Sequence, residues 1–164
     1  LGRRMLAEDN PGELWVERGK KLFSERRGPK NASLERCDFG LGPGKLEGAS
    51  ARLPRYFSDT DRVQDLESRL LTCMVESQGF KLEEIVKSAI SASLSNGSDM
   101  EALAIYVTSR SNGMKMNVTL DHPKEREMYE VLADPFAERP CFGCGRPHVS
   151  GAALVLQTRA CPLE

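Results

Sequence analysis

The sequence lacks an excess of charge of either sign, a long apolar run and a leader-like start. Its 23 lysines and arginines nearly balance 24 aspartates and glutamates, so the net charge is −1 and we expect neither nucleic acid nor an anionic membrane surface as a partner. No apolar run approaches the roughly 20 residues that a membrane-spanning helix needs. No charged segment followed by an apolar one opens the chain, so we expect no membrane span and a mature or trimmed N-terminus.

Histidine is scarce as well, because the chain contains only His122 and His148. Residues 1–120 therefore offer neither a pair of histidines nor a histidine–methionine pair as haem ligands. His122 stands directly before Pro123, and we interpret it as a helix-start or linker residue rather than a ligand.

Five cysteines are unevenly spread along the chain. They are Cys37, Cys73, Cys141, Cys144 and Cys161. In an oxidising compartment Cys37 and Cys73 could pair, which would close a loop of roughly 36 residues and contribute about 3–4 kcal/mol. In a reducing compartment they would be two buried thiols that pack as small hydrophobic groups. Composition leaves both alternatives open.

Hydrophobic periodicity predicts four helices joined by glycine-rich loops. The segments are NPGELWVERGKKLF (10–23), DRVQDLESRLLTCMVESQGF (61–80), KLEEIVKSAISASL (81–94) and SDMEALAIYVTSRSNG (98–113). Asn10 is a suitable N-cap for the first helix, and Ser98 with Glu101 forms a capping box for the fourth. Gly79 is a natural stop for the second. Gly19 leaves a gap between bulky residues, at which another element can approach closely. We find no convincing strand pair, so the predicted fold class is all-α.

The remaining segments are irregular in pattern. Residues 38–61 are rich in glycine and proline and predict a long loop, a kind of segment that is often functional. MKMNVTL (114–120) reads as an extended linker, and DHPKEREMYEVL (121–132) as the start of a further helix that Pro135 would break. Three arginines lie in or beside the long loop: Arg52, Arg55 and Arg62. They form either a solvated surface or a patch that binds a partner protein or an anionic substrate.

Three long segments carry a resemblance to a known family. They are GKKLFSERRGPKNASLERCDFGLGPGKLEGA (19–49), LPRYFSDTDRVQDLESRLLTCM (53–74) and MKMNVTLDHPKEREMYE (114–130). Together they resemble the SoxA family of sulfur-oxidation c-type cytochromes, in its monohaem branch, over about residues 11–131. The resemblance implies a cytochrome c-like helical fold in which the first and last helices cross closely at Gly19. Because the family builds two such domains in tandem, it also implies that residues 1–118 are a first domain without haem, and residues 119–164 the remnant or start of a second.

The resemblance also implies a role for the two N-terminal cysteines and for the protein as a whole. Cys37 and Cys73 fall on the family's disulfide positions. Tyr56, Phe57, Leu46 and Leu53 are candidates to fill the space that a porphyrin would occupy. The implied parent activity is an L-cysteine S-thiosulfotransferase activity in the periplasm, which conjugates thiosulfate to a cysteine of a carrier protein with electron transfer through haem c. The implied partners are the SoxX cytochrome subunit and that carrier. We expect no catalytic residue in this chain and no activity of the chain alone.

The C-terminal segment departs from the family pattern. Its one Cys-x-x-Cys is Cys141-Phe-Gly-Cys144, which is followed by Gly145 instead of histidine, with His148 further on. Haem c attachment needs two thiols and an adjacent histidine, so these three residues are candidates with altered spacing. With Cys161 they could instead bind zinc, which gives the alternative of a small zinc-binding or redox-active helical protein. A tail with incidental cysteines is the third interpretation, and a frameshift, truncation or junction near residue 131 would explain it.

Overall fold

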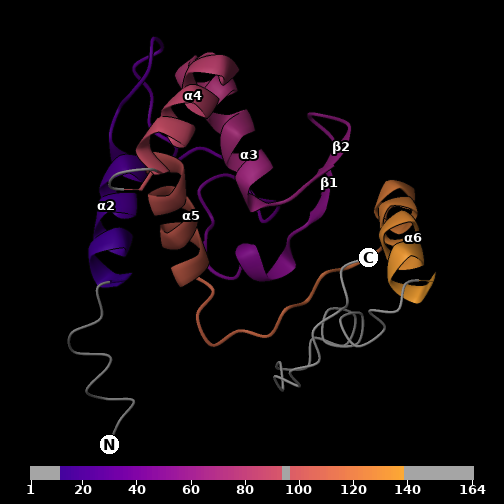
Figure 1. Ribbon diagram of the computed structural model, residues 1–164. Coiled ribbons are helices and arrows are strands. Elements are labelled where there is room, and N and C mark those ends of the chain that lie inside the picture. The colour runs from indigo at the N-terminus through magenta and orange to yellow at the C-terminus, as the bar shows by residue number, and fades with distance from the viewer. Residues whose placement is uncertain (1–11, 94–96, 139–164) are drawn as a thin grey trace, which may run out of the picture.

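The computed structural model describes residues 12–93 and 97–138. Along the chain its elements are helix α2 (Gly12–Ser24), the 3₁₀ turn η1 (Ser50–Arg52), strands β1 (Arg55–Phe57) and β2 (Arg62–Gln64), helix α3 (Leu66–Cys73), the π-helical turn η2 (Met74–Gln78), and helices α4 (Leu82–Ser93), α5 (Asp99–Ser109) and α6 (Pro123–Glu138). Helices α2, α3, α4 and α5 gather on one side, and α6 lies beyond the β1–β2 hairpin (Figure 1). Within the described residues, no helix is both long enough and apolar enough to cross a membrane.

Helices α2 and α5 pack along each other, and Gly19 lies at their contact. A Cβ built on Gly19 would stand only 2.0 Å from the backbone oxygen of Ala102 and 2.6 Å from the Cβ of Tyr106. The predicted close approach at Gly19 is therefore confirmed, and only glycine fits there. The predicted capping box is also confirmed, because Ser98 Oγ accepts a hydrogen bond from the Glu101 amide while the Glu101 carboxylate accepts one from the Ser98 amide.

The segment 61–80 begins as a strand and becomes a helix only at Leu66. Asp65 caps α3 by accepting a hydrogen bond from the Ser68 amide at 2.8 Å. The helix passes into η2 and ends at Gly79, whose φ of 78° is left-handed, as predicted. Before Asp65 the chain pairs with β1, so the expectation of a helix from residue 61 is wrong.

The antiparallel pair of β1 and β2 corrects the all-α expectation. Its register sets Arg55 opposite Gln64 and Tyr56 opposite Val63. Val63 fits the apolar spacing of the helix predicted over 61–80, but it also fits a short strand. Asp61, just before β2, takes a left-handed φ of 53° that turns the chain. Over residues 12–93 and 97–138 the fold is mostly helical with one small hairpin.

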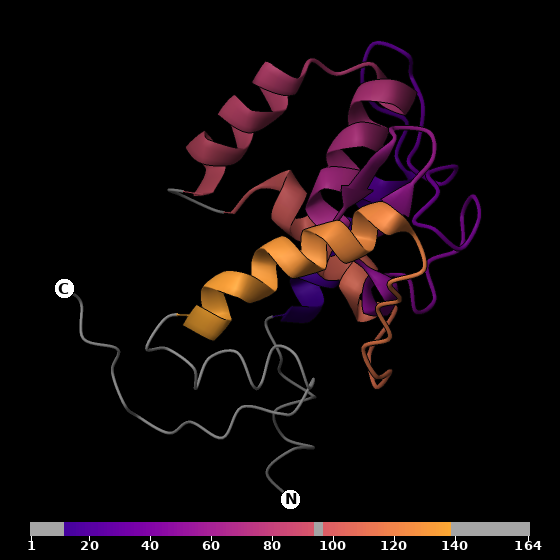
Figure 2. The same ribbon diagram turned by 90° about the vertical axis from the view of Figure 1, so that its right-hand side faces the viewer.

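Helix α6 follows an irregular connection and packs against β1 and β2 (Figure 2). Residues 114–121 have no regular secondary structure, which agrees with the predicted extended linker. The expected break at Pro135 is wrong, since α6 runs on to Glu138. Proline removes one amide donor and crowds the carbonyl four residues earlier. The carbonyl concerned is that of Val131, so the cost falls on one hydrogen bond in the second half of α6 and does not end the helix. Asn10, the predicted N-cap of the first helix, lies outside the described residues, so that prediction is not tested.

Candidate functional site

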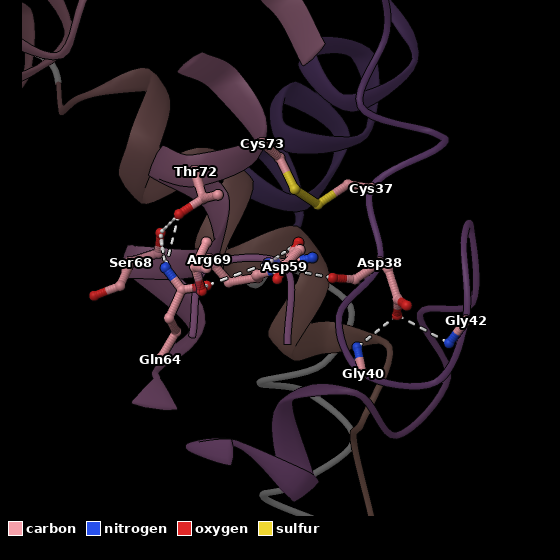
Figure 3. A network of polar contacts seen from close by, with 11 residues as sticks. Cys37, Asp38, Gly40, Gly42, Asp59, Gln64, Ser68, Arg69, Thr72 and Cys73 are labelled. Atoms are coloured by element: carbon pink, nitrogen blue, oxygen red, sulfur yellow. Dashed lines mark hydrogen bonds and ion pairs between the residues drawn. A yellow bond between two sulfur atoms is a disulfide. The ribbon is translucent and has the colours of Figure 1, made fainter. Parts of the chain in front are cut away.

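A disulfide joins Cys37, in the irregular segment after α2, to Cys73 at the end of α3 (Figure 3). The two Cα atoms are 5.8 Å apart and the cysteines are separated by 36 positions. Both are buried, with exposed fractions of 3% and 5%. The bond therefore ties the long loop to the second helix of the bundle, inside the hydrophobic core.

Apolar side chains fill the surroundings of this disulfide. Phe39 and Leu70 are fully buried in the core cluster that contains both cysteines. Of the four residues expected to fill the porphyrin space, Leu46, Leu53 and Phe57 are buried. Tyr56 is not, because it is half-buried and its ring stacks on His122 with centroids 3.6 Å apart.

A buried arginine, Arg69, stands one helical turn before Cys73 on α3. Its Nε donates to the backbone oxygen of Asp38 at 2.6 Å, and its guanidinium pairs with the Asp59 carboxylate at 2.7 Å. It also donates to Gln64 Oε1 at 3.2 Å and lies 4.0 Å from the centre of the Phe57 ring. We call these residues the Arg69 cluster. They join α3 to the long loop and to the hairpin.

Polar contacts extend the Arg69 cluster in both directions (Figure 3). Gln64 Nε2 donates to Thr72 Oγ1 at 2.7 Å, which fastens β2 to the last turn of α3. On the other side, the Asp38 carboxylate accepts hydrogen bonds from the amides of Gly40 and Gly42 at 2.7 and 2.9 Å. Gly42 has a φ of 100°, a conformation that glycine adopts without the steric cost of a side chain. The glycines after Cys37 thus form a turn around Asp38.

Sequence reasoning did not select Arg69. A signal was present, because Arg69 follows Leu66 by three residues and precedes Cys73 by four, so that helical spacing places it on the buried face. The three arginines that were selected have different surroundings. Arg52 and Arg62 are exposed, whereas Arg55 is half-buried and donates to the backbone oxygen of Gly40.

A second charged cluster holds α2 to the start of α5. Asp99 accepts from Arg18 at 2.8 Å and from Arg27 at 2.7 Å. Burial raises the pKa of the Asp99 carboxyl, but the hydrogen bonds and charges of the two arginines outweigh burial and hold that pKa below its usual value. Asp99 is therefore ionised near neutral pH and bridges two segments of the chain.

The residues of the described part do not fit covalent attachment of haem c. Such attachment needs two free thiols with a neighbouring histidine, whereas Cys37 and Cys73 bind each other and His122 stacks on Tyr56 at the start of α6. Among the described residues there is also no group of three or more histidine, cysteine or acidic side chains placed to hold a metal ion. The other candidates, Cys141, Cys144, His148 and Cys161, lie outside the described residues.

Comparison with known proteins places this geometry in a family. The model for "SoxA/TsdA, cytochrome c domain" matches residues 18–116. The chain belongs to this family. It is 45% identical over 149 residues to the L-cysteine S-thiosulfotransferase subunit SoxA of Hydrogenophilus thermoluteolus, which covers 89% of this chain and 54% of that relative. It is 38% identical over 153 residues to a protein of the same name from Hydrogenobacter thermophilus, covering 90% of this chain and 56% of the relative.

The chain thus spans about half the length of the curated relatives it matches. Because these alignments cover about nine-tenths of the 164 residues, the similarity continues past residue 131 whichever residue it begins at. A more distant relative, the SoxA subunit of Paracoccus pantotrophus, is 28% identical over 115 residues and covers 70% of this chain and 36% of the relative. The alternative interpretation, a zinc-binding or redox-active helical protein, finds no support in these matches.

Proposed function

We propose that residues 1–118 form the haem-less first domain of a SoxA subunit, and that residues 119–164 belong to the start of the second. The observation that carries the proposal is the similarity to L-cysteine S-thiosulfotransferase subunits along nine-tenths of the chain. The proposed activity of the whole protein is conjugation of thiosulfate to a cysteine of a carrier protein, with release of electrons to haem c in the second domain. The protein works in the periplasm, where disulfides persist.

The Cys37–Cys73 disulfide supports the haem-less assignment. In a c-type cytochrome the haem is the centre of the core and its thioether bonds hold the surrounding loop. Here the core around the disulfide is filled by side chains such as Phe39 and Leu70, both with 0% exposure. The disulfide and Arg69 hold the loop to α3 in its place. The domain contributes scaffold and binding surface to the complex with SoxX and the carrier, and we expect no thiosulfate conjugation by this chain alone.

A direct test of the haem-less assignment uses the full chain expressed in a periplasm with its haem-attachment machinery. Proteolytic peptides are mapped by mass spectrometry after alkylation without reduction. We expect Cys37 and Cys73 in one disulfide-linked peptide pair, with no haem mass on either peptide. Alkylated Cys37 and Cys73, or a haem-bearing peptide from residues 1–118, would refute the assignment. The same map reads Cys141 and Cys144 separately, so haem at the second site does not confuse the result.

A second experiment tests the partner. Purified chain is titrated with a SoxX haem subunit from a relative, and binding is followed by calorimetry. We expect a defined complex, and we expect the C37S/C73S variant, which cannot form the disulfide, to lose most of its affinity because the loop that presents the surface is released. If the intact chain does not bind, the proposed role as a SoxX-binding domain fails, whereas the disulfide map still decides the haem-less assignment.

A further inference from the structure

One acidic side chain, Glu125, closes the first turn of α6. Its Oε2 accepts a hydrogen bond from the backbone amide of His122 at 3.0 Å, while the Glu125 amide donates to the His122 backbone oxygen at 3.0 Å. A glutamate at this position commonly satisfies an amide that the helix itself leaves free. Glu125 is nevertheless buried, with an exposed fraction of 6%, which is unusual for a charged side chain.

The same carboxylate reaches a second element. Glu125 Oε1 accepts a hydrogen bond from the backbone amide of Tyr56 at 2.6 Å. Tyr56 is the central residue of β1, and among the residues that the structure describes β1 has only β2 as a neighbouring strand. The helix side chain therefore satisfies an amide at the open edge of the strand, as a further strand would.

Additional contacts surround this pair of hydrogen bonds. The rings of Tyr56 and His122 are parallel within 2° at a centroid distance of 3.6 Å. The Tyr56 hydroxyl donates to Asp61 at 2.8 Å, and Lys124 forms an ion pair with Asp61 at 2.6 Å. Ring stacking and an exposed ion pair hold the same two surfaces together, but they constrain orientation less than a carboxylate shared by two amides.

Electrostatics keep the carboxylate ionised. Burial raises the pKa of the Glu125 carboxyl, but the amides of Tyr56 and His122 and the charge of Arg55 outweigh burial and lower that pKa below its usual value. Near neutral pH both oxygens of Glu125 therefore accept hydrogen bonds. A neutral glutamine has one acceptor oxygen and cannot serve both amides through separate oxygens.

We propose that Glu125 is a positioning residue whose single carboxylate docks α6 onto β1 and so fixes the direction in which the chain leaves the disulfide-bonded domain. Both amides are satisfied at once only when the first turn of α6 lies against β1 in this orientation. The connection over residues 114–121 has no regular secondary structure, and the Asn117 amide, which donates to the Ala51 backbone oxygen at 2.7 Å, anchors it upstream of α6. The contact that orients α6 itself against β1 is the one made by Glu125. This inference depends only on the contacts of Glu125 and not on the proposed function.

Hydrogen exchange measured by mass spectrometry on the full 164-residue chain tests the proposal. The variants are Glu125→Gln and Glu125→Ala, with Glu127→Gln as the matched control, because Glu127 is an exposed glutamate of the same helix. In both Glu125 variants we expect exchange of peptides covering β1 and the first turn of α6 to quicken roughly tenfold, since charge-assisted hydrogen bonds are lost. We expect α3 and α5 to exchange as in the wild type, and the control to be unchanged throughout.

Three outcomes with the glutamate variants would overturn the proposal. The first is unchanged exchange at β1 and α6 in both Glu125 variants. The second is faster exchange in α3 and α5 as well, which would make Glu125 a residue of general stability. The third is an equal effect of Glu127→Gln, which would show that the loss of any negative charge in α6 quickens exchange.

A Tyr56→Phe variant keeps the backbone amide and loses the hydroxyl contact to Asp61. We expect its α6 exchange to stay within about twofold of the wild type, and a tenfold rise would assign the docking to the hydroxyl instead.

Discussion

Gly19 and Ala102 are in such close contact that a Cβ on Gly19 would lie 2.0 Å from the Ala102 carbonyl oxygen. No real Cβ contact is that short, so any side chain at position 19 must push α2 and α5 apart. The contact lies beside buried residues of both helices, Leu22 and Leu103. The crossing of the first and fourth predicted helices therefore depends on the absence of one methyl group.

Gly19→Ala tests this dependence. Overpacking a buried contact costs about 1–3 kcal/mol or more, which exceeds the helix-propensity gain of about 1 kcal/mol that alanine brings over glycine. We expect a lower midpoint of urea unfolding. Glu17→Ala, at an exposed position of the same helix, is the control and we expect it to leave the midpoint nearly unchanged. A stabilised Gly19→Ala variant would show that the helices are not in close contact.

The disulfide gives a second prediction. Closing a loop with a sequence separation of 36 restricts the unfolded chain, and the chain-entropy model gives about 3–4 kcal/mol for a loop of that size. We expect Cys37→Ala/Cys73→Ala to lower the free energy of unfolding by about this amount. Reduction of the wild-type chain should have a similar effect, whereas Cys144→Ser should not. A variant whose stability is independent of reductant and equal to the oxidised wild type would contradict the structural role.

The sequence predicted those features of the fold that depend on neighbouring residues. The capping box of α5 and the stop at Gly79 are local patterns, and both are present. At Gly19 the small residue predicted a close approach, and the family resemblance predicted that the last helix of the domain makes it. The hairpin was missed because Val63 fits a helical stripe and a short strand equally well. What decided between them was the pairing of Val63 with Tyr56, which is a tertiary contact.

The candidate site was less predictable for the same reason. A buried arginine is stabilised by partners that the helix does not contain: Arg69 bonds to the backbone oxygen of Asp38, which lies 31 positions away. Likewise Tyr56 was expected in the core, but its ring stacks on His122, 66 positions further on in the numbering. Composition alone left two interpretations of Cys37 and Cys73, a disulfide or two buried thiols, and only the family resemblance favoured the disulfide.

The Arg69 cluster leads to a third prediction. Arg69 has an exposed side-chain fraction of 5%, and its removal leaves the Asp38 carbonyl and the Asp59 carboxylate without their partner. Breaking one partner of a buried ion pair commonly costs about 3–5 kcal/mol. Because the Asp59 side chain is 45% exposed, solvent screens this pair, and we expect Arg69→Met to cost less than that, about 2–3 kcal/mol. Arg69→Lys should recover only part of the loss, because an ammonium lacks the planar fork that reaches several acceptors.

Chemical denaturation of the two Arg69 variants measures this loss. Arg62→Met, at an exposed arginine of β2, is the matched control and should lie within about 0.5 kcal/mol of the wild type. Equal stability of Arg69→Met and the wild type would mean that the free energy of desolvating the buried guanidinium offsets all that its contacts contribute to stability. Full recovery by lysine would show that charge alone, without the fork geometry, stabilises the loop.

The ion pairs of Asp99 make the stability of the α2–α5 contact depend on pH. The two arginines lower the pKa of the Asp99 carboxyl in the folded chain below its value in the unfolded chain. A pKa that is lower in the folded chain stabilises the fold at pH values above the unfolded pKa, which is about 3.9 for aspartate. That contribution disappears as the pH falls through the folded value. We therefore expect Asp99→Asn to lower the unfolding midpoint at pH 7, with a difference from the wild type that shrinks as the pH falls below 4.

Glu83→Gln, at an exposed position in the first turn of α4, should show no such pH-dependent difference. A constant gap between Asp99→Asn and the wild type at all pH values would mean that Asp99 acts through hydrogen bonding that asparagine cannot reproduce, and not through its charge.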